Sequence, residues 1–96
     1  MASYVLIAVH YGTQTKRNEE ISAKIGRAKD WAKFMPSTWL IWTGLSPAAW
    51  FDRISPLLAK NDTLFVAEVT YNWKGRVPPN VAEWVERGRT DDMDGE

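Results

Sequence analysis

Residues Tyr4 to Val9 form an unbroken run of apolar side chains. A run of this kind is typical of a central strand that is covered on both faces of a sheet. The fold must therefore place protein on both sides of that strand, and 96 residues allow only one domain in which to do so. With 45% hydrophobic residues the chain can build a core. This composition excludes an intrinsically disordered protein.

Turn and helix signals divide the rest of the chain into further elements. We expect the following: a helix from about Glu19 to Arg27–Lys29, strands at Trp31–Phe34 and Thr38–Thr43, a helix that starts at Ser46-Pro47, a strand at Thr63–Val69, and a last short helix capped by Asn80. Strand, helix, strand, strand, helix, strand is the order of the ferredoxin-like βαββαβ sandwich. The sequence thus predicts an α+β fold, with a four-stranded antiparallel sheet, two helices on one face and a short C-terminal helix.

Three residues set the expected helix ends. Asn18 is a good cap for the first helix. Gly26 weakens the last turn of that helix. Pro56 falls late in the second helix and is expected to loosen its final turn.

The formal net charge of zero hides an uneven distribution along the chain. The last six residues, Asp91 to Glu96, carry four acids and no base, so residues 1–90 have a net charge of +4. We expect residues 1–88 to form a single ferredoxin-like domain and residues 89–96 to form a disordered acidic tail.

Several classes of protein are excluded by what the chain lacks. It has no cysteine, which excludes disulfides, thiolate zinc sites and cysteine nucleophiles. No apolar run approaches the length of a bilayer span and no signal-peptide pattern is present. We therefore expect a cytoplasmic protein that does not bind membranes. The six glycines form neither a phosphate-binding loop nor a dinucleotide fingerprint.

The chain is rich in tryptophan, with six in 96 residues. Periodicity places three of them at core positions: Trp39, Trp50 and Trp84. The others lie near a turn, on a second strand face and in a loop: Trp31, Trp42 and Trp73. Exposed aromatic rings stack on unpaired bases and are enriched in subunit interfaces. Because the sheet face opposite the two helices needs cover, we expect a homodimer interface at Trp42 or Trp73.

His10 and Glu68 are the candidates for catalysis. His10 is the only histidine, and histidine can act as a general base or contact a phosphate. Alternatively, the His10 ring has only a structural role and hydrogen-bonds to main-chain groups near the end of its strand. Glu68 interrupts an apolar strand, so it either serves a site or faces solvent or an arginine of a dimer partner. No cofactor is expected, except Mg²⁺ if carboxylates assemble a nuclease site.

Basic side chains concentrate between residues 16 and 33. Together with two later residues they form a predicted nucleic-acid interface: Lys16, Arg17, Lys24, Arg27, Lys29, Lys33, Lys74 and Arg76. Such residues can follow a phosphate backbone. An ordinary solvated helix face explains them equally well, because Glu19, Glu20 and Asp30 are interleaved with them.

Four segments carry a family resemblance: Ser37-Thr38-Trp39-Leu40-Ile41 with Thr43, Asn61 to Glu68, Trp73 with Gly75 and Glu83-Trp84, and the opening Ser3-Tyr4-Val5-Leu6. Together they resemble the small bacterial and phage proteins labelled SinR-like, over roughly residues 3–87. Those proteins are similar in turn to the second CRISPR-associated adaptation protein, a family of ferredoxin-like dimers.

The resemblance implies a homodimer that contacts nucleic acid. In the adaptation family, a metal-dependent nuclease activity is associated with an aspartate at the end of the first strand. That position aligns with Val9, or with His10 if the register slips by one, and no Asp or Glu precedes Glu19. The resemblance therefore implies binding without the carboxylate that the nuclease uses.

These observations predict a small homodimeric protein that binds nucleic acid or a nucleotide and is not an enzyme. Two alternatives stay open. The first is a divalent-metal-dependent endonuclease built from other carboxylates, such as Glu68. The second is a phage or bacterial interaction protein that sequesters a host factor or a nucleotide signal in an aromatic pocket.

Overall fold

The computed structural model describes residues 2–12, 17–70 and 73–86, apart from the side chains of residues 17, 18 and 86. Its elements follow in this order: β1 (Ser3–His10), α1 (Arg17–Ile25), β2 (Asp30–Met35), β3 (Thr38–Thr43), α2 (Pro47–Ile54), the 3₁₀ turn η1 (Ser55–Leu57), β4 (Thr63–Val69) and α3 (Pro79–Glu86). The strands form one antiparallel sheet in the order β2-β3-β1-β4. This is the predicted ferredoxin-like arrangement, in which each βαβ pair is split by a third strand.

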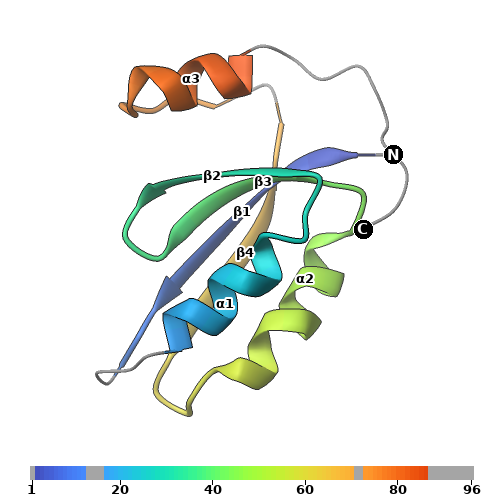
Figure 1. Cartoon of the computed structure of the whole chain (residues 1–96), viewed down its shortest axis with the longest axis vertical. Helices are drawn as coiled ribbons and strands as arrows, with labels where there is room; N and C mark the ends of the chain where they lie inside the picture. Colours follow the sequence, from blue (N-terminus) through green and yellow to red (C-terminus); the bar gives the residue numbers. More distant parts are fainter. Residues whose placement is uncertain (1, 13–16, 71–72, 87–96) are drawn as a thin grey trace.

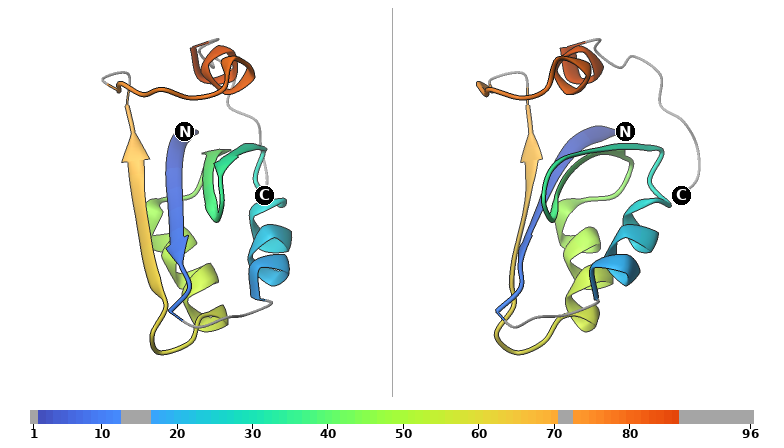
Figure 2. Two further views of the ribbon diagram at one scale, coloured as in Figure 1. Left: turned by 90° about the vertical axis from the view of Figure 1, so that its left-hand side faces the viewer. Right: turned by 60° about the vertical axis from the view of Figure 1, so that its left-hand side comes forward.

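Helices α1 and α2 lie side by side on one face of the sheet, here called the inner face (Figures 1 and 2). Alternate residues of the central strand β1 pack there, and Val5 and Ile7 are fully buried. Trp39 and Ile41 join them from β3, while Leu40 and Trp42 point to the opposite, outer face. The side chains of β3 therefore alternate between the two faces of the sheet.

Helix α2 begins as its sequence predicts. The Ser46 hydroxyl oxygen accepts from the Ala49 main-chain N–H at 3.1 Å, and Pro47 fills the first helical position. The helix ends at Ile54 and continues as η1, because Pro56 lacks the N–H that another α-helical turn needs. Pro56 therefore has the expected effect.

Three predicted boundaries are wrong by a few residues. Helix α1 starts at Arg17, so Asn18 lies inside it and is not its cap, and it ends at Ile25 instead of continuing to residues 27–29. Gly26 and the tight turns after it stop the helix, where the Arg27 N–H donates to the Lys24 carbonyl at 3.1 Å. Helix α3 starts at Pro79, which places Asn80 in its first turn instead of at the cap.

The outer face has its own apolar cluster beneath α3. Val81, Trp84 and Val85 of this helix pack with Leu40 and Trp42 of the sheet. Figure 1 shows α3 across the end of the sheet where β1 begins. Both faces of β1 are therefore covered within one chain, at least near its start. No helix in the described ranges is long and apolar enough to cross a bilayer.

The predicted acidic tail, residues 89–96, lies outside the described residues, as do residues 87 and 88 at the end of the predicted domain.

Candidate functional site

The two predicted catalytic residues lie far apart on opposite faces of the sheet. His10 pairs with Thr63 and Glu68 pairs with Val5, so the two positions lie five residue steps apart along β1, about 17 Å at the rise of a strand. Glu68 shares the parity of inner-face residues of β4, whereas His10 has the parity of the outer face. Both side chains are exposed. The structure therefore does not bring them into one site.

Carboxylates and histidine do not cluster elsewhere in the part of the chain that the structure describes. Within residues 2–12, 17–70 and 73–86, no three of these side chains lie close enough to hold a metal ion together.

The predicted basic set divides into two groups. Lys24, Arg27, Lys29 and Lys33 follow the end of α1 and the adjoining strand β2. Lys74 and Arg76 are exposed in the segment 73–78, which packs on the outer face through Trp73 and Val77. Lys16 and the side chain of Arg17 lie outside the described residues.

The first group surrounds an exposed strand edge, because β2 is an edge strand of the sheet. We define the β2-edge surface as Arg27, Lys29, Trp31, Lys33 and Met35. Trp31 is 47% exposed and Met35 is 51% exposed. Arg27 and Lys33 are also exposed, and Lys29 is half-buried. Trp31 and Lys33 thus share the open inner face of β2, with Arg27 and Lys29 in the connection that leads into the strand and Met35 beyond the register shift at its end.

Trp31 is exposed because the helices on the inner face do not extend over β2. Trp31 pairs with Ile41 and Lys33 pairs with Trp39, so these side chains share the inner face. Ile41 and Trp39 are buried under the helices, whereas their partners in β2 are exposed. The helices cover β3 and leave the inner face of β2 open to solvent.

Lys33 has a defined place on this surface. Its Nζ lies 5.3 Å from the centroid of the Trp39 ring, within the range of a cation–π contact. The contact holds the Lys33 side chain over the buried Trp39 ring at the edge of the core.

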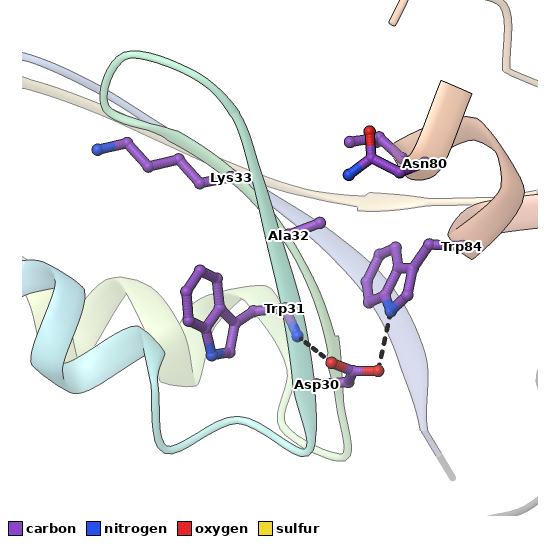
Figure 3. Close-up of a pocket in the computed structure, with 7 residues that line it drawn as sticks. Asp30, Trp31, Ala32, Lys33, Asn80 and Trp84 are labelled. Carbon is purple, nitrogen blue, oxygen red and sulfur yellow. Dashed lines mark hydrogen bonds between the residues drawn. The ribbon is translucent and has the colours of Figure 1, made fainter. Parts of the chain in front are cut away.

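A hydrogen-bonded link joins β2 to α3 beside this surface (Figure 3). Asp30 Oδ2 accepts from Trp84 Nε1 at 2.8 Å, and Asp30 Oδ1 accepts from the Trp31 main-chain N–H at 2.9 Å. The carboxylate thereby fixes the distance between the strand edge and the helix.

Between them lies an open groove of about 340 Å³, lined by residues 30–33 of β2 and by Asn80, Val81 and Trp84 of α3. In Figure 3, Trp31 projects from one side of β2, while Asn80 and Trp84 lie on the other. The groove therefore follows the free edge of β2 between two aromatic side chains.

The residues expected at a dimer interface have intrachain neighbours instead. Trp42 is only 6% exposed; its ring centroid lies 4.8 Å from that of Tyr4, beneath α3. Trp73 is half-buried against the same cluster. Helix α3 of the same chain covers Trp42, and a role for Trp42 or Trp73 in a dimer interface stays a prediction.

Pattern reasoning missed the groove, because Asp30 and Trp84 are 54 residues apart and no local periodicity links them. No protein-family model matches the chain, and no curated protein and no solved structure matches it either.

Proposed function

We propose that the protein is a small non-catalytic homodimer that binds single-stranded nucleic acid or a nucleotide through the β2-edge surface. The observation that carries this proposal is the half-exposed ring of Trp31 on the edge strand β2, with exposed Lys33 on the same face of the strand and exposed Arg27 in the connection before it.

An exposed aromatic ring and neighbouring cations match the two parts of an unpaired nucleotide. Stacking on an aromatic side chain contributes roughly 1–3 kcal/mol per base. Arg27, Lys29 and Lys33 offer cations to the phosphates on either side. The interleaved acid, Asp30, accepts one hydrogen bond on each oxygen, from Trp84 and from Trp31, so its carboxylate is held by the protein.

The separation of His10 from Glu68 supports binding without catalysis by that pair. An acid–base pair must reach one substrate bond, and side chains on opposite sheet faces, from positions about 17 Å apart along the strands, do not.

The homodimer part of the proposal uses the outer face that α3 leaves open. Phe65 of β4 is 60% exposed there and pairs with Ala8 of β1. A large ring beside small side chains suits packing against a second copy of the sheet. Phe65→Glu is expected to convert a dimer to a monomer in sedimentation equilibrium, and a wild-type protein that sediments as a monomer would contradict this part.

Binding is tested by fluorescence anisotropy with labelled 12-nucleotide single-stranded DNA at a series of salt concentrations. Three phosphate contacts predict a slope of log K against log salt of about −2. Trp31→Ala should weaken binding about tenfold or more, from the loss of stacking. Lys33→Gln should make the slope shallower by about 0.7.

Two exposed residues elsewhere supply matched controls. Phe51 on α2 is 44% exposed, and Lys60 lies in the segment before β4, the opposite edge strand. Phe51→Ala and Lys60→Gln should leave affinity and slope unchanged. Equal losses in the control variants, or no binding by the wild type at low salt, would refute the proposal.

A further inference from the structure

The hydrogen-bonding direction of β2 follows from one bond at the end of β1. The Val9 N–H donates to the Ser37 carbonyl at 2.9 Å, so Val9 and every second residue before it direct their main-chain groups toward β3. Their partners in β3, Trp39 among them, face β1 in turn. The next residue, Leu40, therefore faces β2, where its partner is Ala32.

The residues on either side of Ala32 point their main-chain groups the other way. Trp31 and Lys33 thus present N–H and C=O groups to the free edge of the sheet. The bond from the Trp31 N–H to Asp30 Oδ1 agrees with this direction. Three main-chain groups along the described part of this edge have no partner strand: the Trp31 C=O and, next to it, the N–H and C=O of Lys33.

We propose that this edge hydrogen-bonds a nucleobase, and that the preferred base is adenine; the inference rests on the proposed function and deepens it. The C=O of residue 31 would accept from the adenine amino group, and the N–H of residue 33 would donate to the adjacent ring nitrogen. Both hydrogen-bonding edges of adenine present an amino donor, then a ring acceptor, then a C–H group. The C–H group meets the second carbonyl, that of Lys33, as a weak donor.

Guanine and cytosine fit this edge less well. When they pair with the first carbonyl and the N–H, each turns a further acceptor toward the carbonyl of Lys33. Thymine fits the first two groups but brings a methyl group and a smaller ring against the third. Adenine combines the matching pattern with the large ring area that stacking favours.

The surroundings of the edge agree with a flat ligand. A base that bonds to a strand edge lies near the plane of the sheet, with one side toward each face. Trp31 stands on the inner side of β2, and Asn80 and Trp84 stand on the outer side (Figure 3). A groove of about 340 Å³ between them is large enough for a nucleotide.

An added peptide strand is disfavoured by the ends of the same edge. Asp30 already occupies the Trp31 N–H at one end, and a register shift between Lys33 and Met35 interrupts the strand at the other. β-Strand addition needs a longer row of open main-chain groups. Three open groups suit a single heterocycle.

The experiment compares 12-nucleotide oligo(dA), oligo(dC) and oligo(dT) at one salt concentration. We expect oligo(dA) to bind roughly tenfold tighter than the other two, the factor that one or two net hydrogen bonds contribute. Equal affinities would overturn the base assignment and leave the proposed function standing. No binding of any oligonucleotide would overturn both.

A variant pair isolates the main-chain donor. Lys33→Pro removes the charge and the outward N–H, and proline is tolerated on an edge strand where the N–H faces solvent. Lys33→Gln removes the charge alone. We expect the adenine preference to persist in Lys33→Gln and to disappear in Lys33→Pro; persistence in both would overturn the assignment.

A measurement on the wild-type protein covers the case in which Lys33→Pro does not fold. In ¹H–¹⁵N spectra, the Lys33 amide proton should shift downfield and exchange more slowly with oligo(dA) than with oligo(dC). An amide that responds equally to both oligonucleotides would refute the contact.

Discussion

A buried hydrogen bond between β3 and α2 gives the sharpest prediction about stability. Trp50 Nε1 donates to Thr43 Oγ1 at 2.8 Å, and both residues are fully buried. The same oxygen accepts from the Leu45 N–H at 3.0 Å. Thr43→Val keeps the volume of the side chain but removes this acceptor from two donors.

The magnitude follows from the cost of a buried donor left without a partner, about 1–3 kcal/mol. The Trp50 indole N–H has no access to solvent, so the loss of its acceptor carries this full free-energy cost. Leu45 is half-buried, so the loss of an acceptor for its N–H carries only part of the cost. We expect Thr43→Val to lower the free energy of unfolding by about 2–4 kcal/mol. That is a large share of the roughly 5–15 kcal/mol typical of a domain.

Urea denaturation at a fixed protein concentration measures the effect. Thr43→Ser is the control: it keeps the hydroxyl and should cost only about 1 kcal/mol for the lost methyl group. In a Trp50→Phe background, which lacks the indole N–H, Thr43→Val should cost about 1–3 kcal/mol less than in the wild type. If Thr43→Val costs no more than Thr43→Ser, or if the two changes are additive, the reasoning is wrong.

Three further predictions concern the loops and the site. Gly12→Ala should lower stability by about 1–3 kcal/mol in urea denaturation, because its Cβ would overlap the main-chain oxygen of Asn61; an unchanged midpoint would contradict this. Asp30→Ala should leave Trp84 Nε1 without its acceptor and speed amide hydrogen exchange in α3, while exchange in α2 stays as in the wild type. Deletion of residues 91–96, which removes four acids, should tighten oligonucleotide binding at low salt and have little effect at high salt; no change at low salt would count against competition by the tail.

The order of elements could be predicted from the sequence because each signal is local. The apolar run of β1, the alternation in β3 and the Ser46-Pro47 start of α2 involve neighbours in the chain, where the periods of strands and helices apply. Helix ends were less accurate. After Ile25 the chain can form either a tight turn or one more turn of helix α1. The two differ by only a small free energy, and the residue types alone do not decide between them.

The candidate site depended on contacts that no local pattern contains. Trp42 was expected to need a second subunit because the position of α3 was unknown; its cover comes from residues about 40 positions further along the chain. Asp30 was counted only as an acid that dilutes a basic stretch, yet it bonds to Trp84. The exposure of Trp31 depends on how far α1 reaches across the sheet, which is a property of packing and not of strand periodicity.

The residues on the edge of β2 bear on whether this edge binds a ligand, as we propose, or is an ordinary solvated edge. Soluble proteins protect edge strands with lysine, with irregular pairing and with local caps, and this edge has Lys33, a register shift and the Asp30 bond. These features protect the edge strand from pairing with other chains, and none of them requires an aromatic residue. A tryptophan that is 47% exposed on this edge strand adds apolar surface at the place where unwanted strand pairing is most easily started. A polar side chain at position 31 would serve solubility better, so the presence of Trp31 favours contact with a ligand over simple solvation.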